Sequence, residues 1–306
     1  MNQSAVVARR ITHAKHCFLR ACALDVAVRK PGNVSAASPG HGIDAALFLA
    51  SARAAVGPLF EAGARVGPRI EGAWAATWAA AGCNTNLGIL LLCAPLALGV
   101  EQPGALAGKV QLRTALEAVL AALNLDDTRC AYRAIALANP AGLGRADAED
   151  VHAQPHLPLR EAMALAAQRD SIARQYASGY ADLFDPTLPT PPPGFPPVAN
   201  APGAEPDGAT VTHVQQVYLH FMSRWPDSHF VRKHGAAVAH TVMSAAQAWA
   251  QGPAPGADPA FAAWDEALKA RRLNPGTSAD LTVACVFVAL LLAGAAGHGG
   301  AAWHGK

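Results

Sequence analysis

The sequence predicts an all-α protein: a single compact multi-helix domain with one long proline-rich surface loop. Helix-favouring residues (Ala, Leu, Arg and Glu) fill long windows of the 306-residue chain, and apolar residues recur in these windows at three- and four-residue spacing. The alternating runs of β-branched and aromatic residues that indicate strands are nearly absent. Hydrophobic residues make up 52% of the chain, which is enough for a sizeable core.

Polar, turn-forming stretches separate the expected helices. The stretch RKPGNVSAASPGHGID, residues 29–44, divides the first two helices, and GCNTNLG, residues 82–88, precedes a strongly apolar one. A Gly-rich stretch, residues 139–151, indicates a helix stop followed by a new start. PDSHFVRKHG, residues 226–235, and NPGTSADL, residues 274–281, each open a late helix. The helices are expected at 3–29, 43–66, 69–81, 86–98, 110–123, 127–138, 159–184, 210–223, 228–251, 259–271 and 278–296.

The proline-rich segment DPTLPTPPPGFPPVANAPGAEPDG, residues 185–208, interrupts this pattern. It cannot be helical, because proline removes amide donors and restricts the residue before it. Both flanks share the same helical composition. We therefore expect a long surface excursion within one domain that spans 1–306, rather than a boundary between two domains.

Charge and hydropathy narrow the function classes. Charged residues make up 15% of the chain and the formal net charge is +2, which excludes a broad nucleic-acid-binding surface. The longest apolar run, residues 281–297, is near the lower length limit of a membrane span, and no basic residue follows it until Lys306. We expect a buried core helix there and no membrane association. The N-terminus lacks the continuous apolar region of a signal peptide, so the expected location is cytoplasmic.

Four polar clusters stand at loop-to-helix junctions: 29–44, 82–88, 226–235 and 274–281. Each contains N-cap chemistry, and capping alone would account for any one of them; Thr277 and Asp280 even have the spacing of a capping box. Taken together, the clusters hold more Lys, Arg, His and Asp than capping requires. Helix N-termini carry free amides and a partial positive charge, which suit phosphate groups. The candidate ligand-binding residues are Lys30, Asn33, His41, Asn84, Thr85, Arg232, Lys233 and Ser278.

Carboxylates in three of the clusters are candidate ligands for a hard divalent cation such as Mg²⁺: Asp44, Asp227 and Asp280. Because such a cation bridges phosphates, the clusters predict a site for a magnesium–polyphosphate ligand such as ATP. The site requires Lys30, Asn84, Asp227 and Asp280 to line one cavity, whereas capping alone would scatter the four helix starts around the molecule.

A fifth polar feature is QRDSIARQYASGYADLF, residues 168–184, within the expected helix 159–184. Asp170 and Arg174 stand at i,i+4 in this segment. This spacing predicts a solvated ion pair on one helix face.

At the four clusters the sequence resembles the triphosphoribosyl-dephospho-CoA synthase family. The motifs KPGNV, NTNLG, DSHFVRKHG and NPGTSADL occur in the family's order and span about 250 residues. The resemblance implies an all-α enzyme that displaces adenine from ATP and joins the triphosphoribosyl group to the ribose 2′-hydroxyl of 3′-dephospho-CoA, a prosthetic-group precursor. Breaking the N-glycosidic bond gives the ribose oxocarbenium character, which carboxylates can stabilise. We assign metal or acid–base work to Asp227 and Asp280, which makes them the candidate catalytic residues.

The sequence departs from the family pattern in two ways. Where the family often has a His-Lys pair after NT, this chain has Asn86 and Leu87, which removes a possible phosphate ligand. The segments SPGHGID, GLGRADAEDV and RDSIARQYASGYADLF resemble a branch found in methanogens and methylotrophs, near genes of methanopterin- and methanofuran-linked one-carbon metabolism. In that branch a related transferase would use a different acceptor.

Two other functions stay open at this point. One is an all-α enzyme that keeps the phosphate site but hydrolyses the ribosyl bond; the other is a non-catalytic helical binding protein whose clusters are only caps. The expected partners are small-molecule substrates, and the sequence leaves the oligomeric state, including a homo-oligomer, open.

Overall fold

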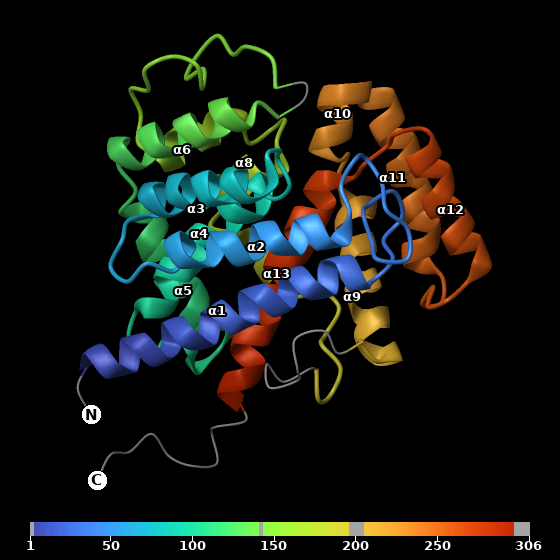
Figure 1. The fold of residues 1–306 in the computed structure, drawn as a ribbon, viewed down its shortest axis with the longest axis horizontal. Coiled ribbons are helices and arrows are strands. Elements are labelled where there is room, and N and C mark those ends of the chain that lie inside the picture. Colours follow the sequence, from blue (N-terminus) through green and yellow to red (C-terminus); the bar gives the residue numbers. More distant parts are fainter. Residues whose placement is uncertain (1–2, 141–142, 196–204, 297–306) are drawn as a thin grey trace.

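The computed structural model describes residues 3–140, 143–195 and 205–296 (Figure 1). This part of the chain forms α-helices joined by loops, with two short 3₁₀ helices and two isolated β-bridges but no strand. The all-α prediction is confirmed. The helices are α1 (Gln3–Ala27), α2 (Ala45–Leu59), α3 (Val66–Ala81), α4 (Leu87–Glu101), η1 (Ala105–Ala107), α5 (Lys109–Ala121), α6 (Leu125–Ala138), α7 (Leu159–Ala166), α8 (Ser171–Ser178), η2 (Ala181–Phe184), α9 (Gly208–Arg224), α10 (Ser228–His234), α11 (Ala236–Gln251), α12 (Pro259–Ala270) and α13 (Gly276–Ala296).

Helix α13 runs through the middle of the fold, between α1–α6 and α9–α12 (Figure 1). It packs against α1, α4 and α9. The window Gly276–Ala293 is long and apolar enough to span a membrane, but 72% of it is buried inside the protein. The prediction of a buried core helix is therefore confirmed.

Two clusters of buried apolar side chains hold the helices together. The larger one surrounds α13 and includes the edge-to-face rings of Phe18, Phe60 and Phe287. The smaller one lies among α9–α12 and includes Tyr218 and Phe261. Since α9 contributes to both clusters, the described helices form one compact domain rather than two.

Two expected helices are broken in the structure. The segment 159–184 divides into α7, α8 and η2, because Asp170 caps the start of α8 by accepting hydrogen bonds from the amides of Ile172 and Ala173. The segment 228–251 divides into α10 and α11 at Gly235, whose φ of +87° no helix can contain. The expected helix 43–66 also ends early, at Leu59.

The described parts of the proline-rich segment, 185–195 and 205–207, are irregular, as predicted. Most of these side chains are exposed or half-buried, but Phe195 is buried against His213 of α9, with ring centroids 4.8 Å apart. The rest of this prediction concerns residues 196–204, which lie outside the described residues.

Candidate active site

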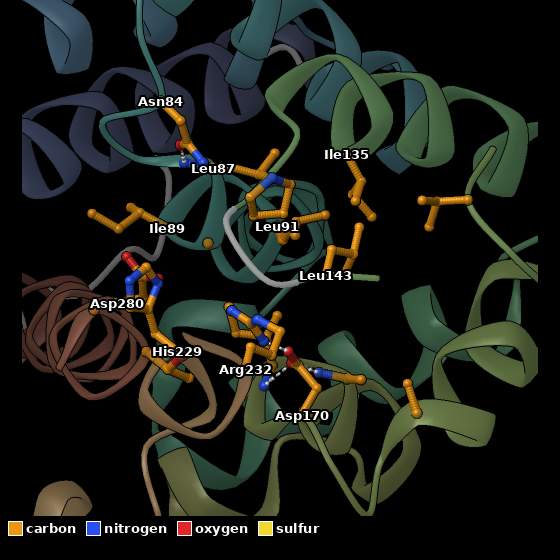
Figure 2. Close-up of a pocket in the computed structure, with 18 of the residues that line it drawn as sticks. Asn84, Leu87, Ile89, Leu91, Ile135, Leu143, Asp170, His229, Arg232 and Asp280 are labelled. Atoms are coloured by element: carbon orange, nitrogen blue, oxygen red, sulfur yellow. Dashed lines mark hydrogen bonds and ion pairs between the residues drawn. The ribbon is translucent and has the colours of Figure 1, made fainter. Parts of the chain in front are cut away.

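A cavity of about 520 Å³ lies where the N-termini of α4, α8 and α13 approach α6, α7 and α10 (Figure 2). Its polar half carries Asn84, Asp170, His229, Arg232 and Asp280. Its other half is apolar and is lined by Leu87, Leu91, Ile135, Leu143 and their neighbours. The volume is in the range of small-molecule and cofactor sites.

All four polar clusters of the sequence contribute to this cavity. The first supplies Asn33, the second Asn84 and Thr85, the third Arg232, and the fourth Asp280. Capping alone would have scattered these junctions. Of the four residues that were expected to line one cavity, Asn84 and Asp280 do so, whereas Lys30 and Asp227 do not. The four clusters therefore meet, but only two of the four named residues face the cavity.

Asp280 projects from α13 toward the first turn of α4. A Cβ atom on Gly88 would lie 2.0 Å from Asp280 Oδ2, so the carboxylate occupies the place where a side chain of α4 would stand. Among the described residues no group donates a hydrogen bond to this carboxylate. Burial raises the pKa of Asp280 well above its ordinary value, and the carboxylates of Asp25 and Asp227 add to the rise. The capping-box spacing of Thr277 and Asp280 does not mark the helix start, because α13 begins at Gly276 and therefore contains both residues.

Asp227 caps α10 and ties it to α13. Its Oδ1 accepts from the amides of His229 and Phe230, at 2.9 and 3.3 Å. Its Oδ2 accepts from the amide and the hydroxyl of Ser278, at 2.7 and 2.8 Å. Burial raises the pKa of Asp227, and the Ser278 hydrogen bonds oppose this rise. Both oxygens are thus committed to protein donors, and neither Asp227 nor Ser278 lines the cavity.

Lys30 forms a buried ion pair with Asp25. Its Nζ is 3.0 Å from Asp25 Oδ1 and also donates to the Asp25 backbone carbonyl. Lys30 is fully buried and does not line the cavity, whereas Asp25 does. Burial raises the pKa of Asp25, while Lys30 lowers it. Lys30 therefore compensates a buried carboxylate at the cavity wall, and no contact of its own with a ligand is available here.

The rest of the KPGNV motif packs the loop after α1 against the loop before α13. A Cβ on Gly32, whose φ is +82°, would lie 2.7 Å from the Leu273 carbonyl oxygen, so the glycine permits an approach to protein rather than to a ligand. Asn33 Nδ2 donates to Asn274 Oδ1 at 3.0 Å, and both side chains line the cavity. His41 Nε2 lies 2.9 Å from the Gly32 carbonyl oxygen and does not reach the cavity.

The NTNLG motif forms the N-terminus of α4 at the cavity wall. Asn84 Oδ1 accepts from the Leu87 amide at 3.2 Å, which satisfies one free amide at the start of the helix, whereas Asn86 stands at the N-cap position and makes no side-chain capping bond. Thr85 Oγ1 is buried and has no hydrogen-bond partner among the described residues. Asn86 is also buried, and Thr77 Oγ1 donates to its Oδ1 at 3.1 Å.

Arg232 of α10 reaches into the polar half and pairs with Asp170 (Figure 2). The predicted ion pair between Asp170 and Arg174 is wrong, because both side chains have other partners: Asp170 caps α8 and pairs with Arg232, and Arg174 pairs with Asp182 at 3.0 Å. His229, one turn before Arg232, also lines the cavity. Burial and the neighbouring cations lower the pKa of His229 to about 4, so its imidazole is neutral at pH 7.

Two further candidates lie away from the cavity. Asp44 is exposed and caps α2, accepting from the Leu47 amide at 2.7 Å. Lys233 is exposed in the last turn of α10. In the described part of the chain no three His, Cys, Asp or Glu residues are grouped so as to hold a metal ion by themselves. A cation at Asp280 would therefore need oxygens from a bound ligand.

Several cavity residues were not among the sequence candidates. Asp170 was expected only as one partner of a solvated ion pair, and His229 lies in the third polar cluster but was not among its candidate residues. The signal that could have identified Asp170 is an acidic residue directly before a helix start. Asp25 gave no sign, since it lies within the helical pattern of α1 and only the fold brings it to Lys30. The loop between α6 and α7 adds Arg145, Glu149 and others to the rim.

Comparison with known proteins shows the family of this chain. A family model described as ATP:dephospho-CoA triphosphoribosyl transferase matches residues 11–298. A crystal structure from Archaeoglobus fulgidus, provisionally assigned as a triphosphoribosyl-dephospho-CoA synthase, has a similar fold, with a TM-score of 0.58 and 23% identity over 80% of this chain and 98% of that one. No curated protein matches the chain. The resemblance carried by the four motifs is confirmed, and with it the prediction of a transferase.

Proposed function

We propose for this chain, which belongs to the ATP:dephospho-CoA triphosphoribosyl transferase family, a magnesium-dependent reaction that releases adenine from ATP. The triphosphoribosyl group passes to an acceptor hydroxyl, with the ribose 2′-hydroxyl of 3′-dephospho-CoA as the first candidate. One observation carries the proposal: Asp280, Arg232 and the N-terminus of α4 face the same polar half of one cavity.

The triphosphate fits this polar half by charge. Helix N-termini bind phosphate through their free amides, and α4 offers its first turn to the cavity. Arg232 adds a guanidinium, whose Nε has no partner among the described residues. We assign the orientation of the phosphates to these groups together with Asn84 and Thr85.

Asp280 is suited to hold Mg²⁺ on the triphosphate. Mg²⁺ is usually bound by one or two carboxylates together with substrate phosphates and water, and the Asp280 carboxylate has no hydrogen-bond donor among the described residues. When bound there, the ion would neutralise charge on the triphosphate. Asp227, whose oxygens are committed, would act by fixing the first turn of α13 through Ser278 and so the position of Asp280.

The proposed step balances without a further reactant. The bond between adenine N9 and ribose C1′ breaks, its electron pair leaves with adenine, and the acceptor oxygen forms the new bond to C1′. The proton that the acceptor hydroxyl loses equals the one that adenine gains. His229, which is neutral and lines the polar half, is the side chain we assign to move it.

Incubation of the purified protein with ATP and dephospho-CoA, with and without Mg²⁺, tests this function. We expect adenine and the triphosphoribosylated acceptor in equal amounts, and neither in EDTA. Adenine together with free ribosyl triphosphate, and no coupled product, would instead show a hydrolase. Formation of AMP or ADP would show that the ribosyl bond is not the one cleaved.

A second candidate keeps the donor and changes the acceptor to one of methanopterin- or methanofuran-linked metabolism. The favouring observation is that Leu143–Val151, from the segment that resembles the methanogen and methylotroph branch, lines the cavity together with the apolar half. With this acceptor, adenine release would stay slow with dephospho-CoA and rise with extracts that contain the other acceptor. Mass spectrometry of the product would identify it.

A further inference from the structure

Asn86 carries a buried hydrogen-bond donor that no described residue uses. Its side chain is 2% exposed, it lines the cavity, and Nδ2 has no partner. Asn86 is the N-cap residue of α4, but its side chain makes no capping hydrogen bond, and its Oδ1 accepts from Thr77 instead. Capping therefore does not explain an asparagine at this position.

Thr77 fixes the direction in which this donor points. The Thr77 side chain lies on α3, is fully buried, and donates through Oγ1 to Asn86 Oδ1 at 3.1 Å. The two polar atoms of a side-chain amide lie on opposite sides of its carbon. With Oδ1 held on Thr77, Nδ2 points away from the Thr77 hydroxyl and is buried, without a partner among the described residues, in the wall of the cavity that Asn86 lines.

The surroundings of Nδ2 select an acceptor with several oxygens. Thr85 Oγ1, next in the chain, is buried without a partner as well. The first amides of a helix have no acceptor within the helix, and those of Gly88 and Ile89 belong to residues that line the cavity. Hydroxyl and amide donors gathered at a helix N-terminus match a phosphate group.

We propose that Asn86 binds a phosphate oxygen of the nucleotide triphosphate at the N-terminus of α4, and that Thr77 is the positioning residue that aims it. This inference rests on the proposed function, because it assigns one more contact to the same phosphate site. It adds a neutral donor that is more deeply buried than Arg232. This donor would recognise the phosphate through a directional hydrogen bond rather than through charge.

Binding of inorganic tripolyphosphate with Mg²⁺, measured by calorimetry, tests the contact without requiring turnover. Asn86→Leu keeps the approximate volume of the side chain and removes the donor, so we expect about tenfold weaker binding or more, as for a hydrogen bond to a charged group. In assays of transfer, KM for ATP should rise while KM for the acceptor stays unchanged. A purely structural asparagine would shift both or neither.

Thr77→Val provides the second variant. It keeps Asn86 but removes the hydrogen bond that orients the Asn86 side-chain amide. We expect a smaller loss of tripolyphosphate affinity, and no additional loss when it is combined with Asn86→Leu. Thr128→Val is the matched control: Thr128 is fully buried, its hydroxyl donates to the Leu157 carbonyl at 2.7 Å, and it does not line the cavity. This variant should bind tripolyphosphate as the wild type does.

The outcomes separate this inference from the function on which it rests. A wild-type protein that does not bind tripolyphosphate contradicts the phosphate site as a whole. Wild-type binding that Asn86→Leu and Thr77→Val both leave unchanged overturns the role of Asn86 alone. If Asn86→Leu does not fold, Thr77→Val decides the question by itself.

Discussion

Asp280 lies so close to α4 that the residue facing it must be glycine. Replacing Gly88 by alanine would put a methyl group 2.0 Å from Asp280 Oδ2, well inside van der Waals contact. Because α4 and α13 are both packed into the core, the carboxylate and not the helices would move. We expect Gly88→Ala to lower transfer activity at least tenfold while the protein stays folded, as measured by adenine release and circular dichroism.

Gly99→Ala is the control for this change in the same helix. A Cβ at Gly99 would meet its nearest atom, the Leu116 amide nitrogen, at 3.6 Å, which is ordinary contact. Alanine also favours the helix by up to about 1 kcal/mol relative to glycine. Activity should be kept in this variant. Full activity in Gly88→Ala would show that the position of Asp280 is not required.

The two candidate catalytic aspartates should respond differently to amidation. Asp227→Asn places an NH₂ group against amide and hydroxyl donors, so it should lower the free energy of unfolding by about 2 kcal/mol through lost hydrogen bonds. Asp280→Asn loses no protein hydrogen bond and should keep stability, whereas turnover should fall by about 10²-fold or more. Denaturant titration without Mg²⁺ and adenine release measure the two effects. Equal loss of stability in both variants would argue against the separate roles.

The sequence could locate the site but not the task of each residue in it. Asn84 and Asp280 were found because polar residues at helix starts are visible in a sequence. Lys30 and Asp227 were found for the same reason, yet they bond to protein groups that only the folded chain supplies: Asp25 for one and Ser278 for the other. Burial and the choice of hydrogen-bond partner decide whether a residue lines the cavity or holds a neighbouring residue in place. The spacing of residues in the sequence shows neither.

At the scale of elements, the break between α7 and α8 is what brings Asp170 to the cavity. An unbroken helix over 159–184 would have left Asp170 on a solvated face. Instead its Oδ1 caps α8 and its Oδ2 pairs with Arg232. The amide of Ser171 also donates to Ser228 Oγ at 2.9 Å, which joins the starts of α8 and α10.

This double use of Asp170 can be separated by two substitutions. Asn is as good an N-cap as Asp, so Asp170→Asn should cost about 1 to 2 kcal/mol of stability, from the loss of a partly buried, hydrogen-bonded ion pair. Asp170→Ala removes the cap as well and should cost about 1 kcal/mol more. Both variants release Arg232, so KM for ATP should rise equally in the two. Denaturant unfolding and steady-state kinetics give the two readings.

Asp258 supplies the comparison. It caps α12, accepting from the Ala260 amide at 2.7 Å, and does not line the cavity. Asp258→Ala should lower stability with no change in KM for ATP. If Asp170→Asn keeps the wild-type KM, the ion pair with Arg232 has no part in nucleotide binding.

Helix existence was easier to predict than helix breaks, for a physical reason. Periodic apolar residues persist through 228–251, and only the backbone angle of Gly235 shows that the chain turns there. An isolated glycine is tolerated inside helices, so the sequence alone does not separate the two cases. The break matters because it makes α10 a short element that carries His229 and Arg232 to the cavity.

At the scale of the whole molecule, α9 links the two apolar clusters. Val217 belongs to the larger cluster and its neighbour Tyr218 to the smaller. The all-α class and the buried position of α13 followed from composition and period, because an apolar helix without a polar face must be surrounded by protein. Which helices share a cluster depends on loop geometry, and the sequence carries no comparable pattern for that.

A buried histidine on α9 should make the stability of the whole fold depend on acidity. His213 is 3% exposed, its Nδ1 has no partner among the described residues, and its ring packs on Phe195. Burial lowers its pKa from 6.5 to about 4. At pH values between these two pKa values, His213 is therefore protonated in the unfolded chain and neutral in the folded protein. The contribution of His213 is complete above pH 6.5 and is lost progressively as the pH falls from 6.5 to 4, by about 3 kcal/mol in total.

His213→Gln, which cannot titrate, tests this dependence by difference. Other groups also respond to acid, but they are shared by both proteins, so the difference between wild type and variant isolates position 213. We expect the free energy of unfolding of the wild type to fall relative to His213→Gln from pH 6.5 to 4 and to run parallel to it above pH 7. His240→Gln, at an exposed position on α11, should run parallel to the wild type throughout. Parallel curves for His213→Gln would mean that His213 accepts its proton in the folded protein as readily as in the unfolded chain, which would contradict the effect assigned to its burial.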